Sequence, residues 1–465
     1  MFKKLAYTFG ANFIALIASI FVTFVVPKSL SVEAYGYFQL YLFYVTYSVF
    51  LNFGWADGMF LKYGGEYYEN LRKSELSGQI LLYNIFQLII SLTIIFGAFT
   101  YQGDYNKRVI IICTGVSVVL VLPRILLQYI LQSTNRIKEY ATLTVVEKIG
   151  YVLCVVAAIA FKTDRYIFFI VADQIGKMCS LACSAYHCRD LFKAKPDSID
   201  KAFEEAVKNI SIGVKLVFAN IAGMFIIGII RLSVEAQWDV VTFGKISLTI
   251  SISNLLMVFI RAVSLVMFPA LRRTATSKIS EIYVLMRTGL MIPLLGMLVF
   301  YYPAKIVLSA WLPQYADSLI YMALLFPMCV FESKMSMLIE TYMKTLRKEK
   351  WLLLVNVVTV SLSVIITLIT TYWLHNLDLA VASIVFLLAF RCVFAELLLS
   401  TVLDVDVKTD IALELALTII FIGASWFIGG ITGLLIYAVA YIAYLVAKRK
   451  DVSMIFKLAT KLKKR

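Results

Sequence analysis

Long apolar runs separated by short polar intervals extend along almost the whole chain. Fourteen of these runs approach the ~17 to 25 residues that a helix needs to cross the hydrocarbon core of a bilayer. They span residues 10–26, 37–55, 80–99, 109–130, 143–161, 166–186, 210–230, 243–268, 282–302, 319–340, 351–374, 379–403, 411–428 and 432–447. The pattern predicts an all-α membrane protein of about 14 transmembrane helices.

Two short segments recur in the two halves of the chain. The pentapeptide Leu-Ser-Val-Glu-Ala follows the first run at 30–34 and the seventh run at 232–236, and a basic run at 136–140 is matched at 347–351. Six helices separate the copies, so both copies enter the membrane from the same side. We therefore expect two parallel six-helix repeats that face each other across a central cavity.

The repeats and the remaining runs define the expected organisation of the chain. It consists of an N-lobe in 1–208, a C-lobe in 209–408, two added helices in 409–447 and a basic cytoplasmic tail in 448–465.

Basic residues are concentrated in alternate loops. With the N-terminus in the cytoplasm, 28 lysines and arginines fall on the cytoplasmic side and 7 on the other. This asymmetry orients membrane proteins, so we expect a multi-pass protein with both termini in the cytoplasm. Because the net charge of +15 is spread between apolar runs, nucleic acid is not an expected partner.

Nine basic residues are predicted to lie within helices, where each costs about 2.5 to 3.5 kcal/mol at mid-membrane. Arg124 and Arg261 have no acid nearby in the sequence, so a cationic, water-filled vestibule for an anionic ligand is the expected explanation. Snorkelling to a helix end is the alternative for four others. These are Lys148, Lys215, Lys245 and Arg287.

Pairing with an embedded acid is the second alternative. The candidate pairs are Asp173 with Lys177, Glu147 with Lys148, and Arg391 with Glu396. Of the embedded acids, Asp57 and Asp173 are candidates for coupling transport to a proton or sodium gradient; neutralising a nearby cation is the other interpretation.

No enzymatic motif is visible. The two histidines lie at helix ends, and neither a phosphate-binding nor a dinucleotide-binding glycine motif is present. The outer loops are too short for the chemistry of a membrane glycan polymerase, which remains the alternative from a different class. We expect a protein that is not an enzyme and has neither a metal nor a cofactor.

Three short motifs resemble those of the polysaccharide or O-antigen flippases of the Wzx type. They are Leu-Ser-Val-Glu-Ala-Tyr-Gly at 30–36, Phe-Pro-Ala-Leu-Arg at 268–272 and Leu-Pro-Gln-Tyr-Ala-Asp-Ser at 312–318. That family belongs to the multidrug/oligosaccharidyl-lipid/polysaccharide exporter superfamily, whose fold is MATE-like with two lobes. The chain departs from many relatives at the end of the seventh helix, where Ile230 and Arg231 replace an acid–base pair.

The resemblance implies a function. It indicates a flippase of the bacterial inner membrane that moves an undecaprenyl-pyrophosphate-linked oligosaccharide to the periplasmic leaflet by alternating access, for O-antigen, capsule or exopolysaccharide synthesis. Membrane lipids, a polysaccharide polymerase and a chain-length regulator are the implied partners. A lipid II flippase and a MATE-type drug exporter are the alternatives within the superfamily.

A pyrophosphate head group requires cations in the cavity. Arg124, Arg261 and Lys215 are the expected contacts, with Lys148 and Arg391 behind them.

Overall fold

Helices make up nearly all of the structure. The computed structural model describes residues 2–255, 279–449 and 451, and within this part of the chain there is no strand. The chain divides into two compact units, Met1–Ile221 and Ala222–Arg465, each with its own apolar core. The division falls within one continuous helix, α9 (Ile199–Gln237).

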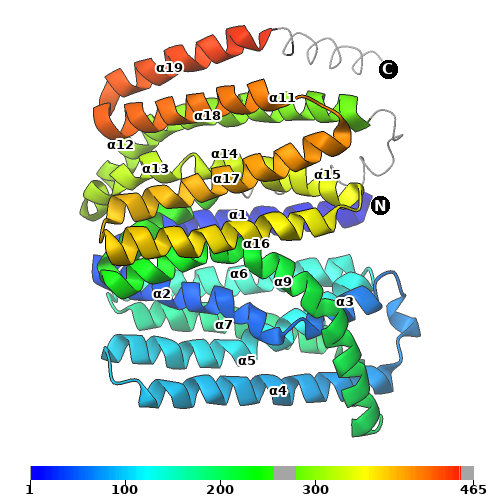
Figure 1. The fold of residues 1–465 in the computed structure, drawn as a ribbon. Helices are drawn as coiled ribbons and strands as arrows, with labels where there is room; N and C mark the ends of the chain where they lie inside the picture. Colours follow the sequence, from blue (N-terminus) through cyan, green and yellow to red (C-terminus); the bar gives the residue numbers. More distant parts are fainter. Residues whose placement is uncertain (1, 256–278, 450, 452–465) are drawn as a thin grey trace. The chain divides into compact units, whose positions relative to one another are not determined.

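The long helices α1, α4, α5, α6 and α7 of the first unit run nearly parallel or antiparallel to one another, and the first part of α9 is steeply inclined to them (Figure 1). Along the chain the helices of this unit are α1 (Phe2–Ser29), α2 (Val32–Ser48), η1 (Val49–Asn52), α3 (Trp55–Lys62), η2 (Tyr68–Asn70), α4 (Lys73–Thr100), α5 (Tyr105–Ser133), α6 (Ile137–Ala160), α7 (Tyr166–His187), α8 (Arg189–Lys193) and the first part of α9. In space α4, α5, α7, α6 and α1 are successive neighbours.

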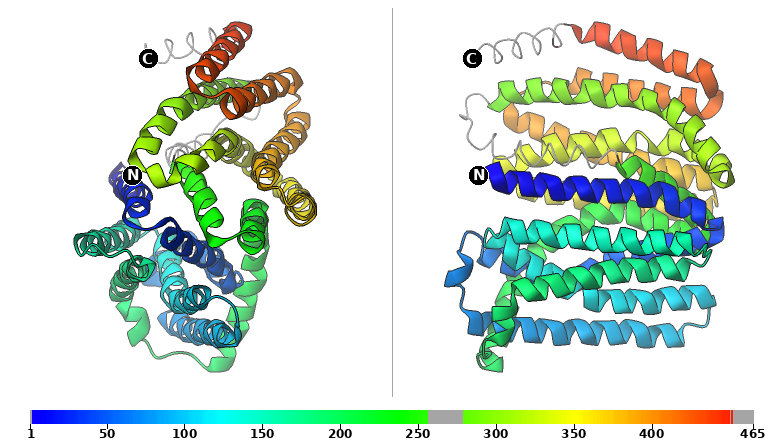
Figure 2. Two further views of the ribbon diagram at one scale, coloured as in Figure 1. Left: turned by 90° about the vertical axis from the view of Figure 1, so that its left-hand side faces the viewer. Right: turned by 180° about the vertical axis from the view of Figure 1, so that it is seen from behind.

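The second unit continues from α9 with a more interrupted series of helices, seen from two further directions in Figure 2. They are Val240–Leu255, α11 (Ile279–Met297), η4 (Leu298–Phe300), α12 (Tyr301–Trp311), η5 (Pro313–Tyr321), α13 (Met322–Leu325), α14 (Met328–Ser333), the π-helix η6 (Lys334–Ile339), α15 (Glu340–Thr345), α16 (Glu349–Thr367), the π-helix η7 (Leu368–Trp373), α17 (Leu377–Leu403), α18 (Lys408–Gly423), the π-helix η8 (Ala424–Ile428) and α19 (Gly430–Ala447).

The predicted all-helical membrane fold is confirmed. Within the described residues, 10 helices are long and apolar enough to cross a bilayer, or 11 if Pro313–Leu325 and Met328–Thr345, bent by 45°, form one span. The count of fourteen stays a prediction. The run 37–55 lies in a broken helix, and the run 210–230 lies in the longer, charged helix α9. The run 243–268 extends beyond the described residues.

The predicted helix 37–55 is broken near its end. Phe53 and Gly54 both adopt left-handed backbone conformations, with φ angles of 51° and 83°, between η1 and α3. Asn52 stabilises this turn, because its side-chain oxygen accepts a hydrogen bond from the Gly54 N–H at 2.6 Å. The break separates α3 from α2 and redirects it toward α9.

Glycines allow α3 and α9 to cross at backbone contact. A Cβ atom on Gly58 would overlap the carbonyl oxygen of Asn209, and one on Gly213 would overlap the carbonyl oxygen of Gly54. Close helix crossings in membranes use small residues in this way. Asn209 also donates a hydrogen bond to the Gln79 side chain at 2.7 Å, which ties α9 to α4.

An ion pair lies at the end of this crossing. Lys62, the last residue of α3, lies 2.6 Å from Glu75 of α4 and 2.6 Å from Glu205 of α9. The first part of α9 is therefore attached to the first unit by backbone packing, a buried amide pair and a charged contact.

One of the two sequence repeats corresponds to a repeated turn. Between α5 and α6, the N–H of Arg136 bonds the carbonyl of Leu131 at 2.9 Å, and Asn135 has a φ of 63°. Between α15 and α16, the N–H of Lys348 bonds the carbonyl of Met343 at 2.8 Å, and Arg347 has a φ of 55°. Both turns have the Schellman geometry that ends a helix, so the repeat of the basic run has a structural counterpart.

The pentapeptide repeat has no such counterpart. In the first copy the Ser31 hydroxyl caps α2 by accepting a hydrogen bond from the Ala34 N–H at 3.2 Å. The second copy, 232–236, lies within the last turns of α9 and ends a helix instead of starting one. The identity of these five residues therefore does not mark equivalent positions of the two units.

Candidate functional site

Arg124 lies in an ion cluster between α5 and α6. Its Nη1 donates to Oε2 of Glu147, and Nζ of Lys148 lies 3.2 Å from Oε1 of the same carboxylate. The pair Glu147–Lys148 was predicted, whereas the acid next to Arg124 comes from the neighbouring helix. Nε of Arg124 is buried and has no partner within the described residues. Two cations share one carboxylate, so the cluster carries a net positive charge.

Asp173 lies in a second cluster of the first unit, on α7. It pairs with Lys177 one turn along the same helix, as predicted, and accepts a hydrogen bond from the Tyr41 hydroxyl at 2.8 Å. Tyr41 also bonds Ser117 of α5 at 2.8 Å. Three helices therefore converge on one buried carboxylate, which pairs with one lysine among the described residues.

Arg391 on α17 has acid partners that the sequence did not indicate. Its Nη1 and Nη2 each lie 3.2 Å from a carboxylate, of Glu332 and Glu340 respectively, and its Nε donates to Asn356 at 2.8 Å. The predicted pair with Glu396 is wrong. The two acids flank the π-helix η6, whose wider turn brings both within reach of one guanidinium group.

Glu396 belongs instead to a buried network in the second unit. It accepts from Nε of Arg287 at 2.8 Å and from Nζ of Lys334, and Glu414 lies 2.9 Å from Arg287 and 2.7 Å from Lys334. Arg287 is only 1% exposed, so the prediction that it snorkels to the membrane surface is wrong. Two cations and two carboxylates balance one another inside a four-helix contact.

The network continues to the end of α19. Asp410 lies 2.9 Å from Arg287 and also pairs with Lys448, which lies 2.9 Å from Asp451. Burial lowers the pKa of Lys448, but its hydrogen bonds to Asp410 and Asp451 outweigh burial and raise the pKa above the usual lysine value. A continuous series of ion pairs therefore joins the buried core to the polar segment after α19.

The other predicted site residues are placed as follows. Asp57 is buried on α3, one turn after the break in the helix. Lys215 is exposed on α9, two residues after the crossing glycine Gly213. Arg261 lies outside the described residues. The structure brings Arg124 and Lys148 together in one cluster and places Arg391 in another.

The Arg287 network was missed because partners were sought along the sequence. Arg287 and Glu414 lie near the start of predicted helices, and Lys334 and Glu396 lie near the end of predicted helices that run in the opposite direction. All four therefore lie at a similar depth on the expected cytoplasmic side. Comparison of depth between helices would have grouped them, and would have placed Glu147 level with Arg124 in the same way.

The fold is one that solved transporters share. No protein-family model and no curated protein sequence matches the chain. Among solved structures, the lipid II flippase MurJ in an inward closed conformation matches with a TM-score of 0.58 at 12% identity, over 97% of this chain and 100% of MurJ. An inward-facing multidrug resistance MATE transporter of the MOP superfamily matches with a TM-score of 0.57 at 12% identity, over 83% of this chain and 92% of its own.

A eukaryotic MATE transporter matches with a TM-score of 0.50 at 13% identity, over 89% of this chain and 97% of its own. The chain therefore has the MATE/MurJ-like transporter fold and is a multi-pass membrane protein.

Proposed function

We propose that this protein is a flippase for an undecaprenyl-pyrophosphate-linked oligosaccharide, acting by alternating access in the bacterial inner membrane. The observation that carries the proposal is the surplus of positive charge in the Arg124 cluster. A transporter of cationic drugs has no use for such a group, whereas a pyrophosphate needs cations to leave the membrane surface.

Arg124 and Lys148 are the head-group contacts in the first unit. Glu147 occupies Nη1 of Arg124, and Nε of the same guanidinium is buried without a partner in the described part of the chain. Such an N–H is costly at membrane depth unless a ligand accepts it. A phosphate oxygen is an acceptor of the right charge, and Lys148 can approach the same phosphate. Lys215 and Arg261 of the proposed set remain proposals from the sequence.

Asp173 is the proposed site of ion coupling, together with Asp57. In the described part of the chain Asp173 pairs with Lys177 and accepts a hydrogen bond from Tyr41, so a proton or a sodium ion would compete with Lys177 for this carboxylate. A proton or sodium gradient would then drive the cycle by changing the charge of this cluster.

A lipid II flippase is the second candidate. The match to MurJ, a lipid II flippase, covers 97% of this chain and 100% of MurJ. Both candidates are flippases for a lipid-linked substrate, so the lipid that is moved distinguishes them.

Transport by the purified protein in liposomes tests the proposal. Undecaprenyl-pyrophosphate-linked oligosaccharide placed in the outer leaflet should become inaccessible to an added sugar-modifying reagent, at a rate that depends on an imposed proton or sodium gradient. Arg124→Ala should lower the rate at least tenfold, because a charge-assisted contact with the phosphate is lost (about 1.5 to 3 kcal/mol). Lys138→Ala, which removes an exposed cation at the start of α6, is the matched control.

The outcomes separate the candidates. Transport of lipid II alone would replace the first proposal with the second. Uptake of a cationic dye with no movement of either lipid would overturn both. An unchanged rate in Arg124→Ala, with the protein folded, would remove the cluster from the head-group site.

A further inference from the structure

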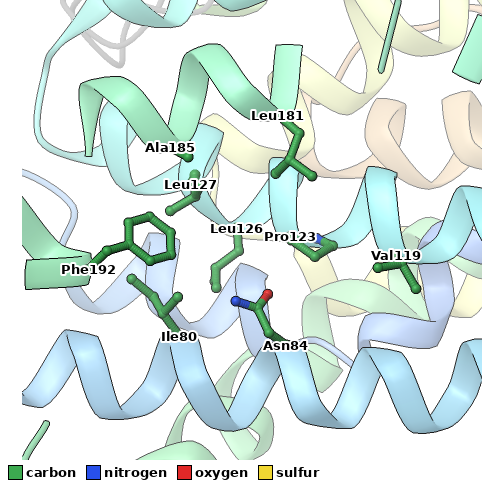
Figure 3. Close-up of a pocket in the computed structure, with 9 residues that line it drawn as sticks. All are labelled: Ile80, Asn84, Val119, Pro123, Leu126, Leu127, Leu181, Ala185 and Phe192. Carbon is green, nitrogen blue, oxygen red and sulfur yellow. The ribbon is translucent and has the colours of Figure 1, made fainter. Parts of the chain in front are cut away.

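An apolar groove lies on the first unit. It has a volume of about 280 Å³ and is lined by α4, α5, α7 and α8 (Figure 3). Its lining includes Ile80, Asn84, Pro123, Leu127, Ala185 and Phe192. Among the nine lining residues Asn84 is the one with a polar side chain. Apolar side chains that line an empty groove lack dispersion contacts on one side. A hydrocarbon chain in the groove would supply these contacts.

The depth of the groove matches one leaflet of the membrane. Ile80 and Asn84 lie about 10 Å and about 16 Å from Lys73 at the start of α4, at 1.5 Å rise per residue. Half of the hydrocarbon core is about 15 Å thick. The side of α4 next to the groove carries exposed apolar side chains such as Leu81 and Ile85, as expected of a helix that faces lipid.

The short helix α8 closes the shallow end of the groove. Leu191 is fully buried, and Phe192 lines the groove in Figure 3. Asp190 accepts a hydrogen bond from the Tyr68 hydroxyl at 2.7 Å and pairs with Lys73 at 2.9 Å, which fixes α8 against α4. Although partial burial raises the pKa of Asp190, the hydrogen bonds from Lys73 and Tyr68 lower it below the usual value, so the carboxylate stays charged and attached.

Three exposed cations lie on α8 or just after it, and the exposed Asp197 follows them. Arg189 and Lys193 of α8, and Lys195 just after it, are exposed, whereas the acid of α8 is already paired with Lys73. Lys193 is adjacent in sequence to Phe192, which lines the groove. The apolar lining of the groove suits the acyl chain of a phospholipid, and the cations at its rim suit an anionic head group.

We propose that this groove, with Arg189 and Lys193 at its rim, binds one acyl chain and the phosphate of an anionic phospholipid from the adjacent leaflet. The bound lipid fills the space between α4, α5 and α7 and holds α8 at the membrane surface. The site is distinct from the Arg124 cluster and does not depend on the proposed transport of a lipid-linked sugar.

Lipid retention measured by native mass spectrometry tests the proposal. The full-length protein, delipidated in detergent, is titrated with phosphatidylglycerol and with phosphatidylcholine of identical acyl chains. One phosphatidylglycerol should be retained at least fivefold more strongly than phosphatidylcholine. Ala185→Trp, which fills the groove, and the double substitution Arg189→Gln with Lys193→Gln should each lower this retention at least fivefold.

Matched variants control for folding and for general charge. Ala182→Trp places the same side chain on an exposed position of α7 outside the groove, and Lys162→Gln with Arg165→Gln removes two exposed cations before α7. Both should bind phosphatidylglycerol as the unmodified protein does. The double substitution of Arg189 and Lys193 changes exposed side chains, so it still tests the proposal if Ala185→Trp does not fold.

Four results would overturn the proposal. Equal retention of the two phospholipids would exclude the cationic rim, and unchanged binding in Ala185→Trp would exclude the groove. Displacement of phosphatidylglycerol by an equal amount of undecaprenyl phosphate would assign the groove to a polyprenyl chain. A dimer mass that disappears in Ala185→Trp would assign it to a second copy of this chain.

Discussion

Charged side chains at membrane depth differ in how completely they are neutralised. In the Arg287 network two cations face two buried carboxylates, and each carboxylate touches both cations. In the Arg124 cluster two cations share Glu147. The first arrangement is suited to holding helices together, whereas the second retains capacity for an anion.

Removal of one charge from the Arg287 network should destabilise the second unit. Glu396→Gln keeps the shape of the side chain but leaves Arg287 and Lys334 with an excess positive charge in a fully buried position. Loss of one partner from a buried ion pair costs about 3 to 5 kcal/mol. Thermal unfolding in detergent should show a clear decrease in the midpoint.

Glu281→Gln is the matched control, because Glu281 lies on α11 one to two turns before Arg287 and is exposed. Its unfolding midpoint should equal that of the unmodified protein. A midpoint for Glu396→Gln that matches this control would show that the network adds no stability.

At the scale of helices, the crossing of α3 and α9 depends on the absence of side chains. Gly58→Ala would place a methyl group against the Asn209 carbonyl, and Gly213→Ala would place one against the Gly54 carbonyl. Because the obstructing atoms are backbone, the helices must separate. We expect a marked loss of stability for each variant and faster proteolysis within the first turns of α9.

Gly97→Ala provides the comparison, because nothing lies within 4 Å of the added methyl group on α4. It should be neutral or slightly stabilising. Similar proteolysis of all three variants would contradict the close crossing.

The attachment of α9 through Lys62 should depend on pH. Hydrogen bonds from Lys62 and then Lys208 lower the pKa of Glu205. The contribution of Glu205 to the stability of the fold is therefore complete above the usual pKa of 4.5, and it is lost as pH falls through the lowered pKa. Burial lowers the pKa of Lys62, but its bonds to Glu205 and Glu75 outweigh burial and raise it. The contribution of Lys62 to the stability of the fold is therefore complete below the usual lysine pKa of 10.5 and is lost only at higher pH.

Unfolding midpoints measured between pH 7 and pH 3 check this dependence. Glu205→Gln should lower the midpoint at pH 7 and weaken its decrease toward pH 3. Glu204 is next in sequence and its side chain is exposed, so Glu204→Gln should leave the pH profile unchanged. Identical profiles for both variants would contradict a role for the Lys62 contact.

At the scale of the whole molecule, the sequence predicted the helices far better than it predicted the ion pairs between them. Apolar length alone identified the membrane helices, because each satisfies its own backbone hydrogen bonds within one segment. The break at Phe53 depends on a local left-handed turn that composition does not reveal. The partners of Arg391, Arg287 and Arg124 lie on other helices, so spacing along one helix could not find them.

The predicted orientation places both ends of the chain in the cytoplasm. A fluorescent reporter that matures only in the cytoplasm should be bright when fused before Phe2 and when fused after Asp451. A periplasmic phosphatase should be active in the α6–α7 loop, near Lys162. Activity of the phosphatase at the C-terminal fusion would show an odd number of spans.

The separation of ion partners along the chain has a consequence for biosynthesis. Arg287 precedes its partner Glu396 by 109 residues, and Lys334 precedes Glu414 by 80. At ~5 to 20 residues per second, the ribosome needs roughly 5 to 20 s to supply the acid that Arg287 requires. During that interval the nascent helix is poorly soluble in lipid, so it must wait beside the insertion machinery, and quality control can recognise a chain whose later helices never arrive.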